Sequence, residues 1–138
     1  MVNIMIVSHH TLAQSLVDTL EMISGQSVED RFHAISLKAG TGMDVYQKEL
    51  DDFLDQNTSD LLVLCDLGYG SPISSLYIKL CEKKIKHKIV SGVNLAMLLV
   101  AYTNIHKDLD TLADLIMEEA KASIDLCFEK LNVNHDDE

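Results

Sequence analysis

Four short apolar segments alternate along the chain with segments of helical periodicity, and this alternation constrains the fold more than any other feature. The first and third segments, residues 2–7 and 61–65, are almost continuously apolar, which is typical of strands buried on both faces of a parallel sheet. The other two strands are expected at residues 32–37 and 88–91. A helical pattern follows each strand, as parallel strands require, because they must be joined by crossover connections.

The helical segments differ in length and in how clearly they end. The first has one apolar face and stops at Gly25, a residue type favoured at helix C-termini. Further helices are expected at residues 43–54, 73–81 and 94–102, and a long last helix at 109–131. The apolar face of the first helix consists of Leu12, Leu16, Leu20 and Ile23.

The β-α-β-α-β-α-β-α-α order predicts an α/β fold. We expect a flavodoxin-like three-layer sandwich with a mainly parallel central sheet of strand order 2-1-3-4 and helices on both faces. The 138 residues form a single domain, 1–138, with an acidic end at 135–138 that we expect to be frayed. In this order, ligands bind at the carboxyl ends of strands 1 and 3.

Charge and composition exclude several classes of function. The net charge of −11 argues against a nucleic-acid partner and suits partners with positive docking faces. The longest apolar stretch, residues 95–102, is too short to span a membrane, and the N-terminus lacks the pattern of a signal peptide. We therefore expect a cytoplasmic protein without direct membrane insertion. Its cysteines, Cys65, Cys81 and Cys127, are interpreted as small buried apolar residues in a reducing compartment.

Two polar clusters follow the strands that meet at the expected ligand-binding edge. Ser8-His9-His10 ends strand 1, and Asp66 follows strand 3. A carboxylate beside a histidine fixes one ring tautomer, which leaves the other nitrogen as a nucleophile or base. A lone histidine at a strand end is more often structural, but here two strand ends converge, so we favour a functional His9 oriented by Asp66.

The segment after Asp66 predicts a helix N-terminus that can hold an anion. Ser71 is expected to be the N-cap and Pro72 the first helical residue. Free N–H groups and the positive end of the helix dipole then face the site. Another helix starts beside it, after His10 and Thr11. We expect this anion site to be lined by Ser8, Thr11, Gly70 and Ser71.

Other catalytic motifs are missing from the sequence. It contains no P-loop, no complete dinucleotide fingerprint and no G-x-S-x-G elbow. His9 and His10 are adjacent, so in an extended chain they point to opposite sides and do not share a metal. No metal and no cofactor are therefore expected. The scattered histidines His33, His87, His106 and His135 are assigned no role in the site.

The motifs together resemble the enzyme IIA domain of the mannose family of the bacterial phosphoenolpyruvate-dependent sugar phosphotransferase system. The resemblance extends from Ile4 to about Leu131. It rests on three segments: the strand ending in Ser8-His9, Leu64-Cys65-Asp66-Leu67-Gly68-Tyr69-Gly70-Ser71-Pro72, and Ser91-Gly92-Val93-Asn94-Leu95-Ala96-Met97-Leu98.

The resemblance implies a phosphocarrier. His9 would take a phosphoryl group from the phosphocarrier protein HPr and pass it to a histidine of the IIB subunit, with Asp66 orienting His9 and Ser71 beside the phosphoryl group. The membrane subunits IIC and IID, reached indirectly, move the sugar. Related domains form homodimers, often by exchanging a C-terminal antiparallel strand, here residues 131–133. Family members often have a small residue after the active histidine, and this chain has His10.

Other functions are compatible with the same residues. Similar domains occur within transcriptional activators, where phosphorylation reports sugar flux. The phosphoryl-donor subunit of dihydroxyacetone kinase has the same fold and a similar Val7-Ser8-His9. An inert interaction domain is the remaining alternative. The sequence does not specify the sugar.

Overall fold

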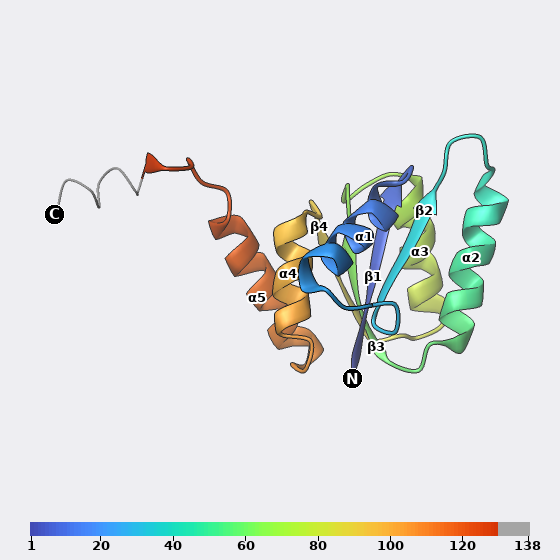
Figure 1. Cartoon of the computed structure of the whole chain (residues 1–138). Helices are drawn as coiled ribbons and strands as arrows, with labels where there is room; N and C mark the ends of the chain where they lie inside the picture. Colours follow the sequence, from blue (N-terminus) through green and yellow to red (C-terminus); the bar gives the residue numbers. More distant parts are fainter. Residues whose placement is uncertain (130–138) are drawn as a thin grey trace, which may run out of the picture.

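The computed structural model describes residues 1–129 as a three-layer α/β sandwich (Figure 1). Four strands form one sheet of order β2-β1-β3-β4 in which all neighbours are parallel, as the sequence predicted. The strands are β1 Val2–His9, β2 Phe32–Leu37, β3 Asp60–Cys65 and β4 His87–Ser91. The helices are α1 Leu12–Ser24, α2 Met43–Gln56, α3 Ser71–Glu82, α4 Leu95–Thr103 and α5 Leu109–Ala122.

Alternate residues of the central strands support two separate cores. Ile4 and Ile6 of β1 face α1, α4 and α5, whereas Met5 and Val7 face α2 and α3. Figure 1 shows these two groups of helices on opposite sides of the sheet. All four side chains are fully buried, and burial of each stabilises the fold by about 1.5–3 kcal/mol.

The last helix is shorter than the sequence predicted. It ends at Ala122, and the N–H and hydroxyl of Ser123 both bond to the carbonyl oxygen of Ala120. Ile124 continues the apolar repeat but is 81% exposed, because it has no core left to cover. Cys127 also lies outside the helix. The expected strand at 131–133 and the expected frayed end at 135–138 lie outside the described residues.

Several inward positions were also assigned wrongly. In α1 the buried side chains are Ala13, Val17 and Leu20, whereas Leu12 and Ile23 are exposed. The periodicity was correct, but the face that contacts the sheet is rotated by about one residue. Of the three cysteines, only Cys65 is buried; Cys81 and Cys127 are exposed.

Candidate functional site

His9 and Asp66 meet at the carboxyl ends of the neighbouring strands β1 and β3. The strands pair with Val7 opposite Cys65. This register brings His9, two residues after Val7, close to Asp66, the residue after Cys65. The His9 ring nitrogen Nδ1 lies 2.9 Å from Asp66 Oδ2, and the backbone N–H of His9 donates to the same oxygen, also at 2.9 Å. The backbone N–H of Leu67 donates to Oδ1 at 2.8 Å. Asp66 is therefore held by three donors and in turn fixes the imidazole ring.

The surroundings keep the Asp66 carboxyl ionised. Burial raises its pKa, but the hydrogen bonds from the His9 backbone, the His9 ring and the Leu67 backbone lower it by more, so the net pKa lies below the ordinary value. A carboxylate can only accept from the His9 ring, so in neutral His9 the proton is on Nδ1. The other nitrogen, Nε2, then carries the lone pair. The His9 side chain is 47% exposed, so a partner can reach it.

The Nε2 side of His9 faces the start of α3. A Cβ placed on Gly70 would lie 3.9 Å from Nε2, and Gly70 has φ +100°, a conformation suited to glycine. The N-cap of α3 is Gly70 rather than Ser71, because the Gly70 carbonyl accepts from the N–H of Ser74. Ser71 is the first helical residue and Pro72 the second. The sequence had predicted Pro72 as the first helical residue, so the helix begins one residue earlier than expected. The expected anion-binding helix end therefore lies beside the imidazole.

Two contacts hold the loop that connects β3 to α3. The hydroxyl of Tyr46, from α2, donates to the carbonyl oxygen of Pro72. Burial, and then the Asp66 carboxylate, raise the pKa of the Tyr46 hydroxyl, so it remains a donor. On the other side, a Cβ on Gly68 would come within 3.3 Å of the Ser91 side chain, so a larger residue at position 68 would require Ser91 to shift by a few tenths of an ångström.

Ser8 is placed differently from the other predicted site residues. Its side chain is fully buried, and its Oγ accepts from the backbone N–H of Ala13 at 2.8 Å and lies 3.5 Å from Ser36 Oγ. The hydroxyl thus satisfies one of the free N–H groups at the start of α1. Thr11 is the N-cap of α1, is exposed and makes no side-chain capping bond.

His10 follows the site in an unusual backbone conformation. It has φ +54°, in the left-handed region, and its N–H donates to the carbonyl of Leu37 at 2.9 Å. A side chain other than glycine costs about 1–3 kcal/mol in this region. His9 and His10 both line a shallow groove of about 450 Å³ that continues along the β2–α2 connection to Lys38 and Met43.

Three exposed apolar residues lie within a few positions of His9 or Asp66 in the chain, and we call them the apolar rim; the sequence patterns did not predict it. Leu12 follows the site in α1, and Leu67 and Tyr69 lie in the loop after Asp66. All three are exposed, Tyr69 at 73%. Large exposed apolar side chains gathered around a site are typical of protein-docking surfaces. The signal was present in the sequence, because these residues flank the two polar clusters.

Two of the other histidines pack against aromatic rings. His33 packs against Phe53, with ring centroids 4.8 Å apart, and His87 contacts Tyr77 at 6.1 Å. His135 lies outside the described residues. Within residues 1–129 no cluster of three or more histidine, cysteine or acidic side chains is arranged to hold a metal. In the same part of the chain, no helix is long and apolar enough to cross a membrane.

Comparison with known proteins identifies the class as IIA components of the phosphotransferase system (PTS). The family model described as "PTS system fructose IIA component", of the mannose type, matches residues 3–120. The chain therefore belongs to this family, whose role is phosphotransfer.

Solved structures agree with this assignment. The chain is similar to the phosphotransferase system component EIIA from Streptococcus agalactiae, with 26% identity and a TM-score of 0.80 over 91% of this chain and 97% of that one. It has the same fold as the mannose/sorbose specific IIA subunit from Enterococcus faecalis, with 22% identity, a TM-score of 0.76 and coverage of 90% and 92%. A sigma-54 interaction domain protein from Enterococcus faecalis also shares the fold, with 17% identity, a TM-score of 0.72 and coverage of 89% and 93%.

Proposed function

We propose that the protein is the phosphocarrier subunit of a mannose-family sugar phosphotransferase system and that His9 carries the phosphoryl group on Nε2. One observation carries the proposal: the Asp66 carboxylate holds Nδ1 at 2.9 Å, while Nε2 faces the start of α3. The family membership supplies the general activity. The remaining steps follow from the chemistry of this arrangement.

In the first step the lone pair of Nε2 attacks the phosphorus of phosphohistidine on HPr. The bond between phosphorus and the donor nitrogen breaks, its electron pair stays on the donor, and the Nδ1 proton of His9 remains in place. The positive charge that develops on the His9 ring is stabilised by the ionised Asp66. In the second step a histidine of the IIB subunit attacks the same phosphorus, and Nε2 recovers its lone pair.

The start of α3 supplies the charge stabilisation for the transferred group. Phosphoryl transfer needs mainly positioning and stabilisation of the phosphoryl oxygens. We assign this role to the N–H and hydroxyl groups of Ser71 and to the close backbone approach at Gly70. Thr11 would supply a further hydroxyl at the edge of the site. Ser8 acts indirectly, because its hydroxyl fixes the start of α1. No nucleotide or metal takes part in this scheme.

The apolar rim around His9 is the surface that we assign to both protein partners. Leu12, Leu67 and Tyr69 are exposed on the segments that follow His9 and Asp66 in the chain. Each partner must approach the same nitrogen, so HPr and IIB use this surface in turn. The net charge of −11 favours encounter with partners that present positive faces. Such exchange takes place in the cytoplasm, with IIC and IID reached only through IIB.

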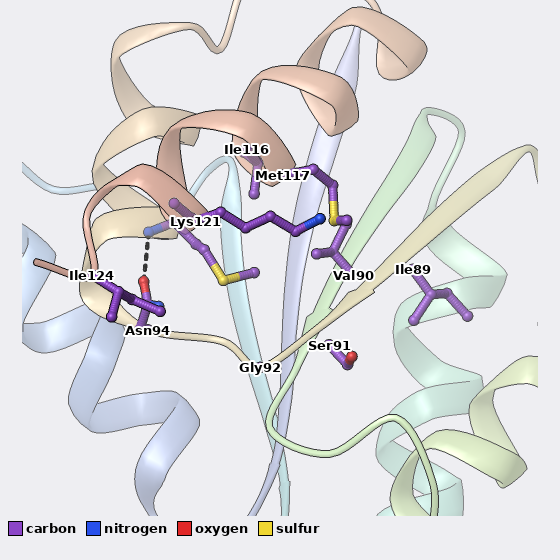
Figure 2. Close-up of a pocket in the computed structure, with 11 residues that line it drawn as sticks. Ile89, Val90, Ser91, Gly92, Asn94, Ile116, Met117, Lys121 and Ile124 are labelled. Carbon is purple, nitrogen blue, oxygen red and sulfur yellow. Dashed lines mark hydrogen bonds between the residues drawn. The ribbon is translucent and has the colours of Figure 1, made fainter.

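A homodimer is the assembly that we propose, based on the outer edge of β4. Among the described residues, β4 pairs with β3 on one side and with no strand on the other. A groove of about 430 Å³ runs between this edge and α5, and Figure 2 shows Met117 and Lys121 of α5 across from Val90 of β4. Unpaired edges of this kind attract another strand. Light scattering should give a dimer mass, and Met117→Lys should lower it, whereas Met22→Lys on α1 should not.

Phosphorylation by the cognate donor tests the main proposal. The protein is incubated with phosphoenolpyruvate, enzyme I and HPr, and its intact mass is measured. We expect one acid-labile phosphoryl group, absent in His9→Ala and retained in His10→Ala. Loss in His10→Ala alone would move the site by one residue. A folded wild-type protein that is not phosphorylated would overturn the proposal.

A regulatory domain is the second candidate, favoured by the shared fold with a sigma-54 interaction domain protein. In such a protein the phosphoryl group on His9 would be a signal rather than an intermediate. Adding the cognate IIB subunit distinguishes the two functions. A carrier loses its phosphoryl group to IIB within the turnover time of sugar uptake, whereas a regulatory domain retains it.

A further inference from the structure

A lysine lines the shallow groove beside His9. The groove has a volume of about 450 Å³ and runs from the end of β1 to the β2–α2 connection. Its polar lining consists of His9, His10, Lys38 and Thr41, and no acidic side chain of the described residues lines it. Because β1 lies between β2 and β3 in the sheet, His9 has the start of α3 on one flank and the β2–α2 connection on the other (Figure 1).

Backbone hydrogen bonds hold Lys38 beside the site. Leu37 is the residue of β2 that pairs with His9, and its carbonyl oxygen accepts from the N–H of His10 at 2.9 Å. The carbonyl oxygen of Lys38 accepts from the hydroxyl of Thr41 at 2.9 Å and from the N–H of Thr41 at 3.3 Å. These bonds fix the base of a long, flexible side chain one residue beyond the partner of His9.

Lys38 differs from most lysines of the described chain because it has no carboxylate partner. It is exposed and forms no ion pair within residues 1–129. The nearest acidic residue along the chain, Asp44, lies in the first turn of α2, outside the groove lining, where the positive end of the helix dipole offsets its charge. The lysines whose Nζ lies 2.5–3.9 Å from an aspartate oxygen are Lys48, Lys79, Lys83, Lys86 and Lys88.

A phosphoryl group on His9 needs a cation of this kind. The group brings a charge of about −2 to a chain whose net charge is already −11. The Asp66 carboxylate, bound to the same imidazole ring, adds to the repulsion. The start of α3 offsets part of this charge from one flank of His9. Lys38 is the cation on the other flank, and a lysine ammonium group binds phosphate as a point charge.

We propose that the ammonium group of Lys38 contacts the phosphoryl oxygens while the group is transferred to His9 Nε2 and while it is held there. The proposal rests on the proposed function, because it requires a phosphoryl group on His9. Lys38 acts on the phosphoryl group itself, so its effect does not depend on which molecule donates the group.

Two phosphoryl donors, phospho-HPr and the small molecule phosphoramidate, test the proposal. In phosphoramidate, which carries a protonated nitrogen, the lone pair of Nε2 forms the new bond to phosphorus. The bond between phosphorus and the donor nitrogen breaks, and ammonia leaves with its electron pair. This reaction needs no docking surface. Intact mass follows the rate of phosphorylation with each donor, and circular dichroism confirms that each variant is folded.

Three variants separate the charge of Lys38 from its other properties. Lys38→Met keeps an unbranched side chain and removes the charge, and it should slow phosphorylation by both donors about 5- to 10-fold. Lys38→Arg keeps the charge and should stay within about twofold of the wild-type rates. Lys84→Met is the matched control, because Lys84 is also exposed and without an ion pair among the described residues, but lies in the α3–β4 connection. It should leave both rates unchanged.

The contrary outcomes are distinct from one another. Unchanged rates in Lys38→Met, with a wild type that both donors phosphorylate at His9, would overturn this inference and leave the proposed function intact. Slowing with phospho-HPr alone would mean that Lys38 contacts HPr instead of the phosphoryl group. Equal slowing in Lys84→Met would reduce the effect to net charge, and equal slowing in Lys38→Arg would reduce it to the shape of the groove; each of these also overturns the inference. A wild type that neither donor phosphorylates overturns the proposed function, and this inference with it.

Discussion

Replacing Asp66 by asparagine should slow phosphorylation of His9 without unfolding the protein. All three neighbours of the carboxylate are donors: the backbone N–H of His9, its ring Nδ1–H and the N–H of Leu67. Asparagine has one acceptor oxygen and one NH₂ group, so one side of the amide must face a donor. If the NH₂ faces His9, it can donate only to an Nδ1 without a proton. The ring proton then moves to Nε2 and blocks the nucleophile.

The size of the effect follows from the number of bonds lost. A hydrogen bond to a charged group contributes about 1.5–3 kcal/mol. One such bond is lost if the NH₂ faces Leu67 and two are lost if it faces His9, so at least one is lost in either orientation. If that loss falls on the transition state, the rate decreases by roughly 10- to 150-fold. The charge that stabilises the positive phosphohistidine ring is lost as well, so this range is a lower bound.

Single-turnover phosphorylation by phospho-HPr, followed by intact mass, measures this rate. Asp108→Asn is the matched control, because Asp108 also accepts from a backbone N–H, at the start of α5, away from His9. It should leave the rate unchanged. If folded Asp66→Asn is phosphorylated at the wild-type rate, the carboxylate does not set the tautomer, and the mechanism proposed here is wrong.

Three further substitutions test other parts of the structure. Gly70→Ala, at φ +100°, should cost about 1–3 kcal/mol in urea unfolding and slow phosphorylation, whereas Gly42→Ala, at φ −75°, should do neither; equal costs would refute the strain. Ser8→Ala should cost about 1–3 kcal/mol by leaving a buried N–H unsatisfied at α1, and an unchanged urea midpoint would contradict this. His33 has a lowered pKa, so folding opposes its protonation, and the protein should lose stability as the pH falls below about 6.5. That loss should shrink in His33→Gln but persist in His106→Gln.

The sequence predicted the sheet well because strand order depends on few variables. Near-continuous apolar strands require a sheet covered on both faces, and right-handed crossovers leave few orders for four strands. Once β1 and β3 are neighbours, His9 and Asp66 must meet. The pair could thus be predicted from two strand ends far apart in the chain.

Side-chain placement could not be predicted to the same accuracy. The α1 pattern predicted one apolar face that included Leu12, but packing against the sheet selected Ala13 and Val17 instead. Leu12 is left exposed as part of the apolar rim. In the same way, the apolar repeat of α5 continues to Ile124, but the helix ends where the core ends.

The sequence alone therefore determined the α/β class, the strand order and the meeting of His9 with Asp66, because these depend on patterns along the chain. Only the tertiary structure decided how each of them is used. Ser8 points into the core to hold α1, Gly70 rather than Ser71 caps α3, and Nε2 rather than Nδ1 is left free. These outcomes depend on backbone angles and on contacts between distant elements, which no local pattern encodes.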